Sequence, residues 1–236
     1  MKLHSALVCF LLIFALLPVV AQTGANDTAN RPLTIEELFL SQDVEIQIMR
    51  SQALAADRDS KLLALQTIRG RIGSGRVSGN ETAVIAVLDA LAGEGVYRVV
   101  RQGGSVVNNF PDIRRQAAGL LGEIGGENAK NILLKIVADD PEPMVLSEAV
   151  YSLGRIGIND PAVTERMVAA LRRNTFRVSP DNNFAYATLL AFEQLSTVGP
   201  GIAQPDILQA LIEVISGNYI EIVKAKALDI LSNLRR

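Results

Sequence analysis

The sequence contains no tryptophan, one histidine and one cysteine. The two rare residues, His4 and Cys9, both lie near the N-terminus, inside a segment that we expect to be removed on export. The rest of the chain then has no thiol for a disulfide or a nucleophile, no imidazole base and no ligands for the usual zinc sites. These absences exclude the enzyme classes that depend on cysteine or histidine chemistry.

The sequence also lacks an excess of basic residues. Lysine and arginine total 23 against 25 aspartates and glutamates, which gives a formal net charge of −2. Loss of Lys2 with the N-terminal segment would make the net charge about −3. A nucleic-acid-binding surface needs a basic excess, so no nucleic-acid partner is predicted.

Motifs for cofactors and metals are absent as well. The chain has no Walker phosphate-binding loop, no G-x-S-x-G nucleophile motif and no dinucleotide-binding fingerprint. The acidic pairs at residues 57 and 59 and at residues 139–140 lack the glycine-centred loop of a calcium site, so turn and capping roles are expected for them. The sequence therefore predicts no cofactor, no metal and no catalytic residue.

The N-terminal segment has the pattern of a secretory signal peptide. Lys2 precedes an apolar run over residues 6–20, and small residues lead to an expected cleavage site near Ala21. The alternative is an uncleaved membrane anchor, but the run is short for a membrane span. We therefore expect a signal peptide at 1–21, a disordered polar spacer at 22–31, and a periplasmic or secreted domain at 32–236 without a membrane span.

Residues 112–125 show the clearest helical pattern in the chain. Apolar residues recur at the spacing of one helix face, at Ile113, Ala117, Leu120, Leu121 and Ile124. Gly125 and Gly126 follow and are expected to end the helix, because glycine adopts a left-handed conformation without steric cost. The pattern recurs 32 residues later, at 146–157, which indicates an array of helical repeats.

The apolar periodicity continues through the whole domain. The apolar periodicity predicts ten helices in about five antiparallel pairs, and therefore an all-α fold. The second helix of each pair is expected to end near Gly73, Gly125, Gly157, Ser196 and Arg235. Two long loops, residues 93–111 and 174–183, each connect the two helices of one pair.

The ends of two helices carry a recognisable motif. The L-G-x-I-G endings at 121–125 and 153–157, with Arg114 and the alanine pair at 117–118, resemble HEAT repeats, most closely the short bacterial type also called the phycobilisome-lyase HEAT-like repeat. The resemblance implies a right-handed α-α superhelix, an armadillo-like solenoid, whose relatives mostly bind proteins. The lyase name implies no reaction here, because no residue matches such chemistry.

These observations predict an exported, non-catalytic HEAT-repeat scaffold that binds protein partners in the cell envelope. One alternative is an accessory or assembly factor of a larger envelope complex. Another is an enzyme that uses Asp, Glu, Arg or Tyr chemistry. Such an enzyme would need two carboxylates converging in one pocket.

The two long loops have similar sequences. Each contains Asn-Asn-Phe preceded by arginines and an aromatic residue, and we expect both to project from the same edge and bind a protein partner. The candidate residues are Tyr97, Arg98, Arg101, Asn108, Asn109, Phe110, Arg172, Arg173, Phe176, Arg177, Asn182 and Asn183. The alternative is that Asn109 and Asn183 are the N-caps of the helices that follow.

The loop at 93–111 allows two local structures. Residues 96–100 and 105–107 could pair as a small hairpin around Gly103 and Gly104. They could instead form one more helical turn followed by coil, which is slightly favoured because two short isolated strands are marginally stable in water.

Overall fold

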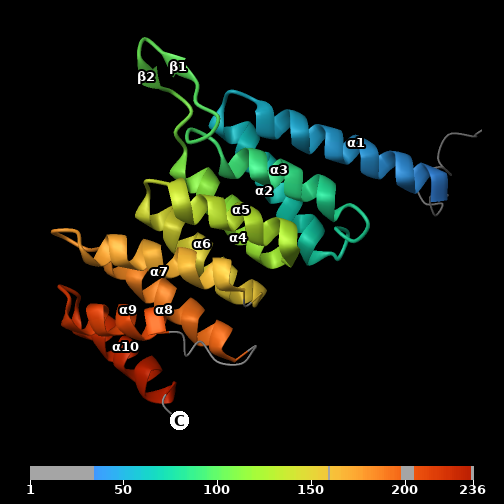
Figure 1. Ribbon diagram of the computed structural model, residues 1–236. Coiled ribbons are helices and arrows are strands. Elements are labelled where there is room, and N and C mark those ends of the chain that lie inside the picture. The colour runs from blue at the N-terminus through green and yellow to red at the C-terminus, as the bar shows by residue number, and fades with distance from the viewer. Residues whose placement is uncertain (1–34, 159, 198–204, 235–236) are drawn as a thin grey trace, which may run out of the picture. The chain divides into compact units, whose positions relative to one another are not determined.

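Nearly all regular structure in the described part of the chain is α-helical (Figure 1). The structure is a computed structural model that describes residues 35–158, 160–197 and 205–234, with side chains of the first helix described from Val44 onward. Contacts divide the chain into two compact units, Met1–Leu40 and Ser41–Arg236, and all helices except the start of the first belong to the second unit. The expected signal peptide and spacer lie outside the described residues.

The described residues contain ten helices and one two-stranded hairpin. The helices are α1 Ile35–Leu54, α2 Arg58–Gly73, α3 Glu81–Ala92, α4 Pro111–Ile124, α5 Gly126–Asp139, α6 Pro143–Ile156, α7 Pro161–Thr175, α8 Asn182–Ser196, α9 Pro205–Ser216 and α10 Glu221–Asn233. The strands β1 Arg101–Gln102 and β2 Ser105–Val106 lie between α3 and α4. The predicted ends of the second helices agree with α2, α4, α6, α8 and α10.

The helices of the second unit pack in two layers. In one layer α2 packs on α4, α4 on α6, α6 on α8 and α8 on α10, and in the other α3 packs on α5, α5 on α7 and α7 on α9. Each helix pair therefore contacts the pairs before and after it, which is the packing of a helical-repeat solenoid. The predicted all-α solenoid is confirmed.

The predicted apolar stripe of α4 forms part of the core. Ile113, Ala117 and Leu121 are fully buried, and Ile124 packs on the core from its margin. The corresponding face of α6 is buried as well, with Val145, Ala149, Val150 and Leu153. A single helix pair cannot cover both of these faces, so their burial requires contacts with the neighbouring pairs.

Glycines allow the second helices to approach each other closely. A Cβ atom added to Gly122 in α4 would lie 2.5 Å from the Ser152 hydroxyl of α6. A Cβ atom added to Gly154 in α6 would lie 2.6 Å from the Ala191 Cα of α8. The first glycine of each L-G-x-I-G motif, Gly122 or Gly154, is therefore required by helix packing.

The structure corrects the expectation for the loop at 93–111. Helical turn followed by coil was favoured, but the chain forms an antiparallel hairpin in which Arg101 pairs with Val106 and Gln102 with Ser105. Gly103 and Gly104, with φ of 56° and 85°, supply the two left-handed residues of a tight hairpin turn. The base is closed by Asn108, whose Oδ1 accepts a hydrogen bond from the Val100 N–H at 2.8 Å. This side-chain bond adds the stability that two short strands lack.

Replacing Gly154 by alanine tests the close packing. Because the new Cβ would collide with α8, we expect Gly154→Ala to lower the free energy of unfolding by about 1–3 kcal/mol. Gly70→Ala is the matched control: Gly70 also lies in a second helix, α2, but nothing lies within 4 Å of an added Cβ, so helix propensity should stabilise that variant by about 0.5–1 kcal/mol. Urea unfolding measures both, and equal effects would contradict the packing.

Asp160 gives a pH-dependent prediction. Its Oδ1 caps α7 by accepting a hydrogen bond from the Val163 N–H at 3.0 Å, and its Oδ2 pairs with Lys130 of α5. The hydrogen bond from Lys130 holds the pKa of Asp160 below its ordinary value of 3.8. A lowered pKa means that the stabilisation is present above the unfolded value and is lost as the pH falls through the folded pKa.

Asp160→Asn keeps a capping oxygen but removes the charge. We expect wild type to be more stable than this variant from about pH 5 to pH 7, with the difference closing below about pH 4. The midpoints of urea unfolding, measured for both proteins across this pH range, test the expected difference in stability. A difference that is unchanged at the acidic end would show that the ion pair with Lys130 is not its source.

Candidate partner-binding surfaces

The structure brings the two predicted loops to one edge of the helix stack. The turns α3–α4, α5–α6, α7–α8 and α9–α10 lie on this edge (Figure 1). Adjacent turns are joined by hydrogen bonds: the Tyr97 hydroxyl lies 2.8 Å from Asp139 Oδ2, and Arg173 Nη2 donates to the Val137 carbonyl at 3.1 Å. Burial and the bond to Asp139 raise the pKa of Tyr97 above its ordinary value of 10.0.

A buried arginine organises the edge. The side chain of Arg114, on α4, is fully buried and makes a bidentate pair with Asp140, with Nε–Oδ2 and Nη2–Oδ1 distances of 2.6 and 3.2 Å. Its Nη1 donates to the Glu94 carbonyl at 3.1 Å and to Asn109 Oδ1 at 2.7 Å. Arg114 therefore links the α3–α4 loop to the turn that follows α5. Asp140 has a structural role, in keeping with the expectation for the acidic pairs.

The N-cap interpretation of Asn109 is wrong. Phe110 occupies the cap position of α4 and makes no side-chain capping bond, while the Asn109 side chain accepts from Arg114. Asn108 is buried, and its amide donates to Glu94 Oε1 at 2.7 Å. Glu94 is in turn paired with buried Lys61 at 3.2 Å. Both asparagines therefore bind the chain's own residues.

The second loop has its own internal hydrogen bonds. Asp181, not Asn183, caps α8, since its Oδ1 accepts from the Phe184 N–H at 2.8 Å. Buried Asn174 exchanges hydrogen bonds with the Asp181 backbone and donates to the Tyr219 hydroxyl at 3.0 Å. Burial raises the pKa of Tyr219. The N-cap interpretation of Asn183 is therefore also wrong.

Internal contacts also account for several other predicted residues. Asn182 Oδ1 accepts from the Ile220 N–H at 3.0 Å, and Arg172 pairs with Glu213 at 3.1 Å. Phe110 packs against the core. Tyr97, Asn109 and Arg173 are exposed but bond to other elements, and Asn183 is exposed on α8. The exposed predicted residues on the loops whose side chains bond to no other element are Arg98, Arg101, Phe176 and Arg177. A partner role for this edge stays a prediction, and it now rests on those four.

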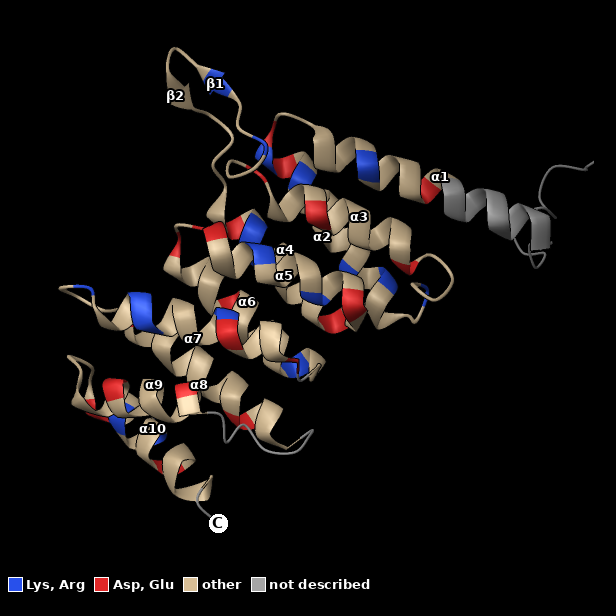
Figure 2. Ribbon diagram, in the orientation of Figure 1, with Lys and Arg blue, Asp and Glu red and all other residues tan. Residues whose placement is uncertain are grey.

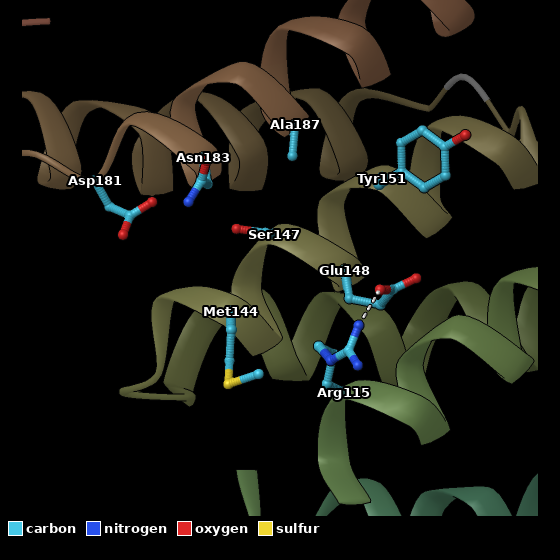
Figure 3. A pocket seen from close by; sticks show the side chains of 8 residues that line it. All are labelled: Arg115, Met144, Ser147, Glu148, Tyr151, Asp181, Asn183 and Ala187. Atoms are coloured by element: carbon cyan, nitrogen blue, oxygen red, sulfur yellow. Dashed lines mark ion pairs between the residues drawn. The ribbon is translucent and has the colours of Figure 1, made fainter. Parts of the chain in front are cut away.

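A groove along α4, α6 and α8 was not predicted as a site. Its central hollow has a volume of about 400 Å³ (Figure 3). The residues that line it are Arg115, Met144, Ser147, Glu148, Tyr151, Asp181, Asn183 and Ala187. Adjoining hollows share Arg115 and Glu148 on the α2 side, and Asn183 and Ala187 on the α10 side, so the groove continues across neighbouring repeats.

Charges on the groove walls are largely paired between helices. Arg115 lies 3.6 Å from Glu148, and Glu123, which lines the hollow on the α2 side, lies 3.8 Å from Arg155 of α6. The Arg115 side chain is 44% exposed, so the exposed N–H groups of its guanidinium can donate to a ligand oxygen, whereas its Nε is buried without a hydrogen-bond partner. Tyr151, Ser147 and Met144 add an aromatic, a hydroxyl and an apolar contact, and such a mixture suits an extended polypeptide.

The groove could have been found from repeat alignment. Arg115, Glu148 and Tyr151 are non-core, partly buried positions of α4 and α6. The loops were predicted as sites because they are long and both contain Asn-Asn-Phe. The groove residues are ordinary polar residues at regular spacing, and that regular spacing was the available signal.

Comparison with known families identifies the repeats. Residues 106–179 match the family model for HEAT repeats. This part of the chain is a HEAT-repeat array. The match contains α4 to α7, and the same two-layer helix packing continues into the helices on both sides. No curated protein and no solved structure matches the chain.

Two further features of the described residues bear on function. No group of three or more His, Cys, Asp or Glu side chains among them could hold a metal ion. None of the described helices is both long enough and apolar enough to cross a bilayer.

The buried Arg114–Asp140 pair predicts a large stability effect. Arg114→Met leaves the Asp140 carboxylate buried without its cation, and we expect a loss of about 3–5 kcal/mol. The exposed pair Arg58–Asp112, at 2.7 Å, provides the control, since Arg58→Met should change stability little. Urea unfolding compares them. Equal effects of the two substitutions would contradict the role given to Arg114.

Proposed function

We propose that this chain is an exported, non-catalytic scaffold that binds an extended segment of a protein partner along the groove of α4, α6 and α8. The observation that carries the proposal is the continuity of this groove across successive HEAT repeats. HEAT repeats suggest a protein-interaction role, and we propose the groove as the binding site.

The groove offers three kinds of contact to a polypeptide. Asn183 can exchange hydrogen bonds with main-chain groups, and the Ser147 hydroxyl, which donates to the Pro143 carbonyl, can accept one. Arg115 can bind a carboxylate or a carbonyl, and Tyr151 and Met144 can cover apolar side chains. These side chains lie on helices that neighbouring helices hold in place. A preformed surface loses little conformational freedom on binding, which favours association.

Catalysis is not part of the proposal. An enzyme in the central hollow would need two available carboxylates. Glu148 is paired with Arg115, and Asp181 Oδ1 caps α8. Both carboxylates therefore already stabilise the fold.

Export is proposed from the N-terminal sequence. The lysine, apolar run and small residues before Gln22 favour secretion, and cleavage there would place the HEAT repeats in the periplasm or outside the cell. A chain without cysteine after that point folds without disulfides, so its stability there rests on the repeat interfaces.

A second candidate function, an assembly factor of a larger envelope complex, is favoured by the last repeat. Ile212 of α9 and Leu228 of α10 are large apolar residues with about half of their surface exposed. If this repeat docks on a larger complex, contacts should form at Leu228 rather than in the groove.

Photo-crosslinking separates these functions. We expect a tagged chain with p-benzoylphenylalanine in place of Tyr151 to give a protein adduct in envelope extracts of its source. The same group at Glu165, which is exposed on α7 outside the groove, should give several-fold less. Exchanging the wall charges by Arg115→Glu with Glu148→Arg should weaken the Tyr151 adduct.

An adduct from Leu228 without one from Tyr151 would favour the assembly factor. Equal adducts from Tyr151 and Glu165, or none from Tyr151, would contradict the groove as the binding site.

A further inference from the structure

Two loops on the turn edge expose apolar side chains, beside the strands in the hairpin and in the turn between α7 and α8. In the α7–α8 turn, Phe176 is 76% exposed and Val178 is 98% exposed. In the β1–β2 hairpin loop, Val99, Val100 and Val107 have about half of their surface exposed. These residues are not covered by any described part of the chain.

The same two loops are basic. Residues 95–111 and 176–180 contain arginines and no aspartate or glutamate, although the chain as a whole has net charge −2. The carboxylates at the loop bases, Glu94 and Asp181, accept hydrogen bonds from Asn108 and from the Phe184 N–H. Arg98, Arg101 and Arg177 are exposed within them. Figure 2 shows basic residues without acidic ones at both tips. By contrast, Arg172, at the base of the second loop, is paired with Glu213.

Both loops are held firmly at their bases. Buried Asn108 closes the hairpin through Val100 and Glu94, and buried Asn174 ties the α7–α8 turn to Tyr219. These hydrogen bonds fix where the loops leave the helices, while the exposed apolar side chains of the loops stay uncovered. Each anchored loop combines apolar and basic residues. We call these residues of the two loops, taken together, the tip surface: Val99, Val100, Val107, Phe176, Val178, Arg98, Arg101 and Arg177.

We infer that the tip surface contacts an anionic lipid bilayer. Apolar side chains flanked by arginines fit the boundary between headgroups and acyl chains, where the apolar parts leave water and the guanidinium groups bind lipid phosphates. A protein partner offers apolar anchors a pocket to fill, whereas a bilayer accepts separate convex tips without a matching shape. This inference replaces the protein partner that the sequence suggested for the exposed loop residues.

The tip surface and the groove share no residues. Lipid contact through the tips therefore leaves the groove lining open to the proposed protein partner. The inference does not depend on the proposed function, because either surface can fail its test while the other passes.

Site-specific fluorescence tests the inference on the full chain. Cys9→Ser removes the natural cysteine, and single cysteines are then introduced by Val178→Cys, Val100→Cys or Ser78→Cys and labelled with the polarity-sensitive dye NBD. Ser78 is exposed in the α2–α3 turn, on the opposite edge, and serves as the control. Vesicles contain equal parts phosphatidylglycerol and phosphatidylcholine, or phosphatidylcholine alone.

We expect NBD emission to rise and shift to the blue at positions 178 and 100 with the phosphatidylglycerol vesicles and to stay unchanged at position 78. Because the label reports its own position, vesicle binding through the N-terminal apolar segment would not produce this pattern. Arg177→Gln, tested with the label at position 100, should weaken the vesicle affinity about fivefold. Arg98→Gln, tested with the label at position 178, should weaken it by the same factor.

Three results would overturn the inference. The first is that NBD emission does not change at positions 178 and 100, and the second is that it changes equally at position 78. The third is that vesicles of phosphatidylcholine alone change the emission as much as the phosphatidylglycerol vesicles do. A protein crosslinked from position 178 with no lipid response would return the tip surface to a protein partner.

Discussion

The close approach of α4, α6 and α8 is the constraint on which the rest of the structure depends. Each helix pair has an apolar face that only the next pair covers, and stacking removes these faces from water. Gly122 and Gly154 set how near the helices come, because a side-chain carbon at either position would overlap the next helix. The stack is therefore held by contacts between neighbours, with no single centre.

That packing positions both candidate surfaces. The second helices stack side by side, so their uncovered polar positions, Arg115, Glu148 and Asn183 among them, line one groove. The same stacking brings the turns together on one edge, where Arg114 and Asn174 bind residues of adjacent turns. The buried polar groups of this edge fix the loops, and the exposed loop residues are left available for contact with something outside the chain.

The fold could be predicted from the sequence because it depends on sequence patterns within single helices and turns. Helix periodicity and the glycines after α4 and α6 are visible in short windows, and the L-G-x-I-G endings led to the HEAT resemblance. The roles of the loop residues depend on distant partners. Asn109 and Asn108 resemble contact residues until Arg114 and Glu94 are placed beside them. The hairpin similarly depends on a bond from Val100 to Asn108, which periodicity does not reveal.

Native-state hydrogen exchange, followed amide by amide, tests most directly whether neighbouring repeats stabilise one another. The slowest amides should lie in α4, α6 and α8, which have a described repeat on each side, and protection should fall through α9 toward α10. Greatest protection in α10 or in the hairpin, with rapid exchange in α6, would contradict this account of the chain.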